Sequence, residues 1–266
     1  MVTSRVSVAM TIAGVDSGGG AGITADLKTF EAHGVWGTCA IVAVTAQNTL
    51  GVQGVETISP AMVREQILAV ATDIGVDAVK TGMLATAEHV VAVADALIEI
   101  GSPPLVVDPV AVSKHGDPLL AVDAISALKE RLLPLATVVT PNLPEAEALT
   151  GRTIRTRADM EAAAAELPGR TILVKGGHLE GAQSPDVVHD RGTVRWLEGE
   201  RIAGRHTHGT GCVLSAAITA ELANGMDPVD ACVAGKVFVT RAIAAGVALG
   251  QGVGPVNPGW RRESAW

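Results

Sequence analysis

Short runs of apolar residues alternate with longer amphipathic segments along most of the chain. Several short runs, such as LVVD and TILVK, are apolar at consecutive positions, which is typical of strands covered on both faces of a sheet. A sheet of this kind places its helices in layers above and below the strands. The runs predict strands at residues 6–13, 37–45, 77–81, 104–108, 137–140 and 171–175.

The segments between these strands carry signals for helix starts and stops. Ser, Thr or Asp before a helix supplies an N-cap, Pro is favoured at the first helical position, and Gly ends a helix. These signals predict helices from Ser59-Pro60 to Asp73, from Thr86 to Gly101, and from Asp227-Pro228 to about Leu249.

Residues 186–203 follow a different pattern. The text VVHD-RG-TVRWL indicates an antiparallel hairpin with Arg191-Gly192 at the turn. The chain contains no repeat, low-complexity tract or linker, so we expect residues 1–266 to form a single domain. Alternating strands and helices imply an α/β fold with a mostly parallel sheet, and such sheets bind ligands beyond the carboxyl ends of their strands.

Composition narrows the class of protein. Of 266 residues, 48% are hydrophobic and 18% are charged, which favours a large core and excludes disorder. The net charge of −8 and the lack of a basic run make nucleic acid and anionic membranes poor partners. No run reaches the ~18 apolar residues of a membrane span, and residues 6–15 lack the cleavage site of a signal peptide. We expect a cytoplasmic protein.

The three cysteines form no C-x-x-C pair and are odd in number. Neither a disulfide framework nor a zinc site is favoured, and the spacing His206-x-His208 has no third ligand pattern beside it. Cys39 and Cys232 are expected in the core. Aromatic residues make up only 2% of the chain, with no Tyr, two Phe and four Trp, so a ring-shaped ligand has few stacking partners.

Polar and charged side chains that could bind a ligand or take part in catalysis lie in the loops after the predicted strands. The loop GVDSGGGAGI lacks the Lys-Ser/Thr of a P-loop, and its glycines predict close approach of a small ligand rather than a dinucleotide site. Asp26 follows one turn into the next helix, where it either contacts a ligand or favours the positive helix end.

The segment Gly209-Thr210-Gly211-Cys212 opens a helix. Free N–H groups at such a start bind a phosphate or a developing oxyanion. Cys212 would lie in that positive field, which is expected to lower its pKa and favour the thiolate. The alternative is a small buried cysteine that packs the helix start.

Two carboxylates and a lysine complete the candidate site. Asp108 ends the run LVVD at the ligand edge, and Asn142-Leu-Pro-Glu145 places a Glu in a first helical turn, where capping alone would explain it. Together these carboxylates could position Mg²⁺. Lys175 ends the run TILVK and suits the charge of a phosphate.

With these residues assembled, the chain resembles the hydroxymethylpyrimidine/phosphomethylpyrimidine kinase family of thiamine biosynthesis, within the ribokinase-like superfamily. The resemblance covers residues from about 8 to 256 and implies a three-layer α/β/α fold. The matching segments are TIAGVDSGGGAGITADLKTF, TAQNTLGV, KTGML, VVDPV, SKHGDPLL, TPNLPEAEAL, KGGH, HTHGTGCVLSAAI and GVGPV.

The resemblance implies ATP-dependent phosphorylation of 4-amino-5-hydroxymethyl-2-methylpyrimidine and then of its monophosphate. It also implies a homodimer and a flap at Ser113 to Asp117. The pyrimidine site would comprise Gly14, Asp26, Gln47, Met83 and Val110.

Catalysis would depend on the loop Gly209, Thr210, Gly211 and Cys212 as an anion hole, with Cys212 as the base, where many superfamily members have Asp. Lys175, Thr210 and Asn142 would bind the nucleotide, and Asp108 and Glu145 would organise Mg²⁺.

Two other functions stay open. The first is a pyridoxine or pyridoxal kinase of the same superfamily, because some of these enzymes share the G-T-G-C segment. The second is a pyrimidine-binding regulatory protein without catalysis, which would have a broken anion hole or lack the carboxylates. We expect Val110, Met83 and Cys212, rather than an aromatic wall, to grip the pyrimidine ring.

Overall fold

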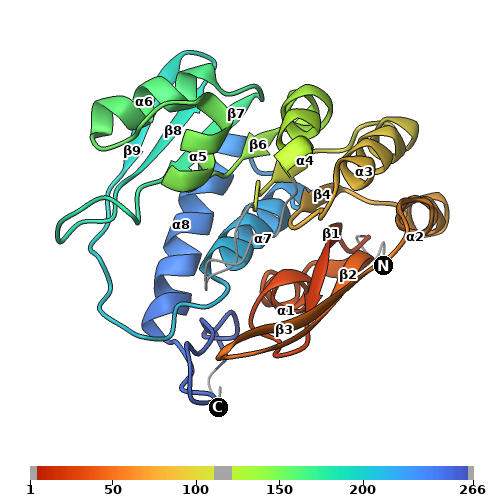
Figure 1. Ribbon diagram of the computed structural model, residues 1–266, viewed down its shortest axis with the longest axis horizontal. Coiled ribbons are helices and arrows are strands. Elements are labelled where there is room, and N and C mark those ends of the chain that lie inside the picture. Colours follow the sequence, from red (N-terminus) through yellow and green to blue (C-terminus); the bar gives the residue numbers. More distant parts are fainter. Residues whose placement is uncertain (1–4, 111–121, 263–266) are drawn as a thin grey trace.

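The computed structural model describes residues 5–110 and 122–262. The strands in these ranges are β1 (Val8–Asp16), β2 (Trp36–Asn48), β3 (Gly51–Thr57), β4 (Ala78–Thr81), β5 (Leu105–Val107), β6 (Val138–Val139), β7 (Thr171–Lys175), β8 (Asp186–Asp190) and β9 (Thr193–Leu197). They form one sheet in the order β3-β2-β1-β4-β5-β6-β7-β8-β9 (Figure 1). The pairings from β2 through β7 are parallel, whereas β3, β8 and β9 pair antiparallel at the two edges.

Helices cover both faces of this sheet. They are α1 (Gly22–Ala32), α2 (Pro60–Asp73), α3 (Ala87–Glu99), α4 (Val122–Ala127), α5 (Leu143–Thr150), α6 (Arg157–Glu166), α7 (Thr210–Ala223) and α8 (Pro228–Ala244), with a π-helical turn at Leu128–Leu132 and a 3₁₀ turn at Leu133–Leu135. Buried side chains of α2, α3, α5 and α6 form one core with the sheet, and those of α1, α7 and α8 form the cores on its other face. The three-layer α/β/α prediction is confirmed.

The six predicted parallel strands are confirmed, and so are the helices that begin after Ser59 and Thr86, because both side chains accept a capping hydrogen bond. The predicted end of the last helix at Leu249 is wrong. That helix ends at Ala244, and its C-cap N–H groups bond to Arg241 and Ile243 carbonyls. Strand β3 was not predicted, because most of its residues are exposed.

The hairpin predicted in residues 186–203 is confirmed as β8 and β9. Asp190 pairs with Thr193, which leaves Arg191 and Gly192 as the two turn residues. Both have positive φ, 47° for Arg191 and 84° for Gly192. Two consecutive left-handed residues are typical of the turn whose twist matches that of the flanking strands.

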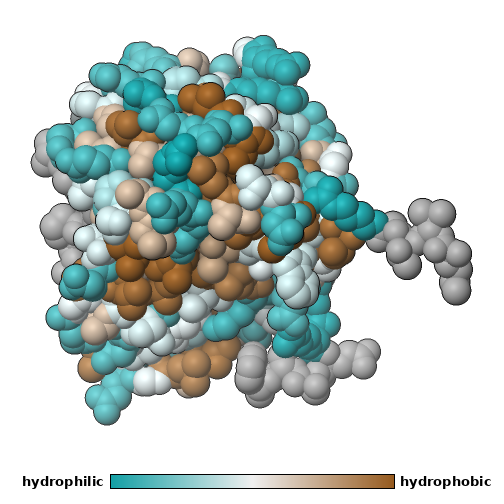
Figure 2. Space-filling view, turned by 90° about the vertical axis from the view of Figure 1, so that its right-hand side faces the viewer, coloured by the Kyte–Doolittle hydropathy of each residue, from teal (hydrophilic) through white to brown (hydrophobic). Residues whose placement is uncertain are grey.

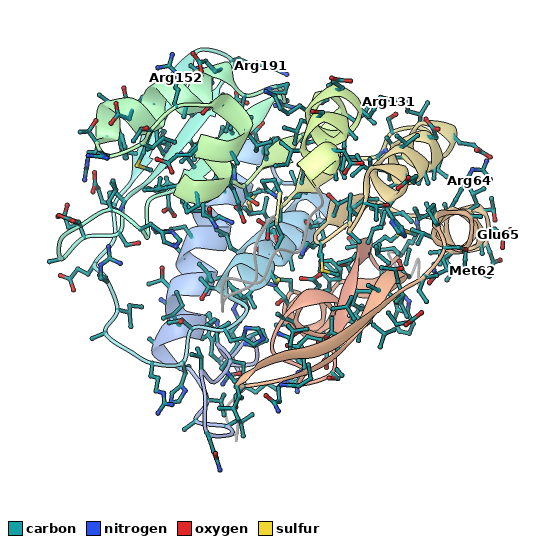
Figure 3. All side chains as sticks on the ribbon, in the orientation of Figure 1. Met62, Arg64, Glu65, Arg131, Arg152 and Arg191 are labelled. Carbon is teal, nitrogen blue, oxygen red and sulfur yellow. The ribbon has the colours of Figure 1, made fainter. Side chains whose placement is uncertain are left out.

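The surface combines apolar patches with charged side chains (Figure 2). Figure 2 shows apolar patches among hydrophilic residues on the face where α2 lies. Arg64, Arg131 and Arg152 extend outward at the periphery (Figure 3), where each pairs with a carboxylate. Exposed pairs of this kind contribute little stability. Among the described residues, no helix is long and apolar enough to cross a membrane.

Candidate active site

A pocket of about 800 Å³ opens at the carboxyl ends of the parallel strands. Most of the residues predicted for the site line it, although they come from distant parts of the chain. The flap predicted at Ser113 to Asp117 lies outside the described residues. Lining the pocket are Gly14, Gln47, Met83, Asp108, Val110, Asn142, Glu145, Lys175, Gly209, Thr210, Gly211 and Cys212.

The Gly209–Cys212 segment forms the first turn of α7, as predicted. Gly209 caps the helix with a φ of 80°, and a Cβ atom at this position would lie 1.9 Å from the carbonyl oxygen of Gly20. Only glycine fits this close approach. The first turn of α7 therefore directs its N–H groups to the pocket beside Lys175, whose Nζ would lie 3.6 Å from a Cβ on Gly211. An anion fits this arrangement.

Cys212 does not have the low pKa that its place at a helix start predicted. Burial raises the pKa of the thiol to about 11, even though the nearby Lys80 ammonium acts in the opposite direction. The carboxylates of Asp26 and Asp108 raise it further. The sulfur accepts a hydrogen bond from the backbone N–H of Gly22, at 3.4 Å. In the ligand-free protein Cys212 is therefore a neutral thiol at neutral pH.

Lys175 joins the two carboxylates predicted to organise Mg²⁺. Its Nζ lies 2.9 Å from Oδ1 of Asp108 and 3.7 Å from Oε2 of Glu145. The two carboxylates hold the pKa of Lys175 above its usual value despite burial. Burial tends to raise the pKa of Asp108, but Lys175 and Lys80 outweigh it and the net shift is downward. Lys175 is thus a cation and Asp108 a carboxylate at neutral pH.

Glu145 has two roles in the ligand-free protein. It forms a capping box with Asn142, whose side chain accepts from the Glu145 N–H at 2.9 Å while the Glu145 carboxylate accepts from the Asn142 N–H at 2.7 Å. Burial raises its pKa to about 7, although Lys175 opposes this shift. A buried carboxylate that shares a cation with Asp108 fits a divalent metal, because Mg²⁺ is bound through one or two carboxylates together with phosphate oxygens and water.

Asp26 lies beneath the pocket rather than in its wall, contrary to the prediction. It is fully buried, and both carboxylate oxygens contact Nζ of Lys80, at 2.9 and 3.0 Å. The hydroxyl of Thr11 donates to the same carboxylate at 2.6 Å. Lys80, itself fully buried, lines the pocket instead. Sequence reasoning missed Lys80, although a lysine inside the short apolar strand AVKT was a visible signal.

The residues predicted to bind the ring line the pocket, with the exception of Asp26. Gly14 packs against Met83, since a Cβ on Gly14 would lie 2.6 Å from Cε of Met83. Gln47 and Val110 lie in the same wall. Among the described residues that line the pocket there is no Phe or Trp, and the grip on a ring by Met83, Val110 and Cys212 stays a prediction.

At the other end of the pocket, Arg201 organises the loop that follows Lys175. Its guanidinium donates to the carbonyl oxygens of Gly177, Leu179, Gly181 and Gln183, at 2.7, 2.6, 3.0 and 3.3 Å. This contact was not predicted, because Arg201 carries no motif. Four carbonyls turned toward one cation fix the loop, and Arg201 and Gly177 themselves line the pocket.

Of the other two cysteines, Cys232 is buried, as expected, whereas Cys39 is only partly buried. The pair His206 and His208 does not form a metal site. His208 binds Asp16 through Nε2, and Nδ1 of His206 accepts from the N–H of Gly254. Within residues 5–110 and 122–262, no group of three or more His, Cys, Asp or Glu side chains could hold a metal.

Comparison with known proteins agrees with this geometry. The family profile described as phosphomethylpyrimidine kinase matches residues 16–257. A hydroxymethylpyrimidine/phosphomethylpyrimidine kinase of Streptomyces coelicolor is 50% identical over 254 residues, which cover 94% of this chain and 94% of the relative.

Two solved structures have the same fold. A Bacillus subtilis pyridoxal kinase in an ADP complex has a TM-score of 0.90 and 40% identity, and the match covers 98% of this chain and 100% of that one. A phosphomethylpyrimidine kinase of Clostridium difficile 630 has a TM-score of 0.79 and 41% identity, over 90% of this chain and 100% of the other.

Proposed function

Because the chain belongs to the phosphomethylpyrimidine kinase family, we propose that it transfers the γ-phosphoryl group of ATP to 4-amino-5-hydroxymethyl-2-methylpyrimidine, and then to the resulting monophosphate. One observation carries this proposal. A single pocket holds the amide of Gln47, the anion-binding turn Gly209–Cys212 and the Lys175–Asp108 pair. Recognition of a polar ring and transfer of a phosphoryl group therefore occur in one cavity.

The pyrimidine ring lies against Gly14, Gln47, Met83 and Val110, which line the pocket. The amide of Gln47 pairs with the polar edge of the aminopyrimidine, and Met83 supplies an adaptable apolar contact. Gly14 lets the ring approach the sheet edge. Asp26 acts indirectly, because its partner Lys80 and not Asp26 itself reaches the pocket.

Phosphoryl transfer depends on position and charge more than on covalent steps. The hydroxymethyl oxygen of the substrate forms a bond to the γ-phosphorus, and the bond from that phosphorus to the β-phosphate oxygen breaks, which releases ADP. The N–H groups of Gly209–Cys212 stabilise the charge on the transferred group, and Lys175 neutralises the nucleotide phosphates. Thr210 and Asn142 border the nucleotide phosphates in this arrangement.

Asp108 and Glu145 would hold Mg²⁺, which on binding neutralises charge on the nucleotide phosphates. Both side chains contact Lys175, so cation and carboxylates meet at one point of the pocket. Glu145 would hold the metal as a carboxylate, so any proton on its side chain would compete with Mg²⁺.

Cys212 remains the base in this proposal, but only in the complex with the substrates. The ligand-free thiol holds its proton, so Cys212 first has to release that proton to water after the substrates bind, and the thiolate then accepts the proton of the substrate hydroxyl. Lys80 is the nearby cation that favours this thiolate. We further propose that residues 1–266 act as one catalytic domain of a cytoplasmic homodimer.

A substrate panel with product identification tests the function. Purified protein with ATP and Mg²⁺ is given hydroxymethylpyrimidine, its monophosphate, pyridoxine or pyridoxal, and the products are separated by mass. We expect the first two to be phosphorylated in sequence. Turnover of pyridoxal without turnover of hydroxymethylpyrimidine would favour the pyridoxal kinase function instead, and no turnover of any compound would favour a binding protein.

A further inference from the structure

His208 immediately precedes the anion-binding turn and is 8% exposed. Its Nε2 lies 2.8 Å from Oδ2 of Asp16, the last residue of β1. Burial tends to raise the pKa of Asp16, but the hydrogen bonds from His208, Gly18 and Gly20 outweigh it, and the pKa is lowered. Asp16 is therefore an ionised acceptor, and the proton on Nε2 of His208 points at it.

The same nitrogen of His208 faces the amide of Gln47. Nε2 of Gln47 lies 3.4 Å from Nε2 of His208, and the hydroxyl of Thr45 donates to Oε1 of Gln47 at 3.1 Å. An imidazole nitrogen that donates its proton has no lone pair left to accept another. His208 therefore supports the Gln47 amide sterically and leaves its N–H groups for an acceptor atom in the pocket.

Both the backbone and the ring of His208 are held in place by neighbouring segments. Its backbone N–H donates to the carbonyl of Gly254 at 3.1 Å, and its own carbonyl accepts from the N–H of Val256 at 3.0 Å. Gly20 packs directly on the ring, because a Cβ there would lie 2.6 Å from Cδ2 of His208. The ring is therefore held against Gly20, and the backbone of His208 is held by Gly254 and Val256.

We propose that His208 is a positioning residue, which orients the Gln47 amide for the pyrimidine. This inference rests on the proposed function, since it names how the pyrimidine part of that site is held.

The test is a double-mutant cycle on Gln47 and His208, with the KM for hydroxymethylpyrimidine, the KM for ATP and kcat measured for each protein. We expect H208A to raise the pyrimidine KM about tenfold, the size of one lost orienting contact, and to leave the ATP KM within about twofold. In the Q47A background, H208A should change the pyrimidine KM by less than about twofold, because the two side chains act as a unit.

Three variants control for folding. H208Q keeps an N–H near the position of Nε2 and should restore most of the pyrimidine affinity, whereas H208N, which is shorter, should not. H206A is the matched control, because His206 lies in the same loop and also contacts Gly254 without touching Asp16 or Gln47. Its pyrimidine KM should stay within about twofold of the wild type.

The outcomes separate the two proposals. Wild-type protein that does not phosphorylate hydroxymethylpyrimidine refutes the proposed function before any variant is measured. If the wild type is active, equal effects of H208A with and without Gln47 overturn the positioning role alone. Equal increases in both KM values, or an H206A effect as large as that of H208A, would also overturn it.

Discussion

At the scale of single residues, Cys212 has an environment that two opposing effects determine. The N-terminus of α7 favours a negative charge on its sulfur, whereas burial disfavours one, and burial prevails with a pKa of about 11. A cysteine that serves as the base and one that only shapes the anion hole differ in what their replacement does.

We expect C212A to lower kcat by a factor on the order of 10²–10⁴ if the sulfur accepts the substrate proton, with ATP binding unchanged. C212D supplies a carboxylate that can accept the proton, and it should retain more activity than C212A. A kcat for C212A near that of the wild type would leave Cys212 with a packing role alone.

Alkylation measures the pKa directly. In the ligand-free C39S protein, the rate at which iodoacetamide modifies Cys212 should rise about tenfold per pH unit, because the thiolate fraction does so below a pKa of about 11. Mass spectrometry of the Cys212 peptide follows the reaction. A rate that levels off near neutral pH would show that the helix start prevails over burial.

At the scale of elements, α1 and β4 are joined by the buried pair of Asp26 and Lys80. D26A leaves the Lys80 ammonium buried without its partner, and removing one member of such a pair costs about 3–5 kcal/mol of unfolding free energy. The double variant D26L/K80M should recover most of that loss, because no charge is left uncompensated. Urea unfolding of the three proteins provides the measurement.

The variant D26N distinguishes a structural role for Asp26 from substrate contact. D26N protein with wild-type stability and a raised KM for the pyrimidine would restore the original interpretation, in which Asp26 lines the site. Lower stability at a nearly unchanged KM is the result that the geometry favours.

Elements with a two-sided apolar environment could be predicted from sequence, and elements at the edge could not. β1, β4 and β7 are buried along almost their whole length, so their consecutive apolar residues identify them. β3 is an exposed edge strand with the sequence GVQGVET, and its neighbour β2 supplies its only pairing among the described strands. Nothing in its local pattern distinguishes it from a loop.

At the scale of the whole molecule, the site exists because parallel strands end at one edge. Asp108 follows β5, Glu145 lies in the first turn of the helix after β6, and Lys175 is the last residue of β7. The sheet order brings the three side chains into one ion-pair network. The strand-end rule was sufficient to predict this assembly. It could not predict Asp16 and His208, because their contact spans 192 positions and depends on how two loops pack.

This network predicts a pH dependence. The Glu145 proton competes with Mg²⁺ below a pKa of about 7, so the Mg²⁺ concentration that gives half-maximal rate should fall as pH rises from about 6 to about 8. E145Q cannot titrate, and its Mg²⁺ midpoint should be higher and nearly independent of pH. A wild-type midpoint that stays constant over this range contradicts the assignment of Glu145.

The pH dependence of stability runs the other way: a higher pH favours Mg²⁺ binding at Glu145 but lowers the contribution of this side chain to the unfolding free energy. The folded protein raises the pKa of Glu145 from 4.5 to about 7, so between these values the folded chain binds more protons than the unfolded chain. The contribution of Glu145 to the unfolding free energy is therefore present at low pH and is lost as pH rises toward 7 in the absence of ligands.

The scarcity of aromatic residues has a practical consequence for anyone who measures binding. Trp36 lies at the amino end of β2, Trp196 lies in the hairpin, and Trp260 packs on Phe238. None of these three chromophores borders the described pocket, and the chain has no Tyr. The intrinsic fluorescence of these three residues will therefore report on β2, the β8–β9 hairpin and the surroundings of Phe238, and not on the pocket. Calorimetry is therefore the direct way to follow substrate binding, because a tryptophan introduced at the pocket edge would be read against the four tryptophans of the chain.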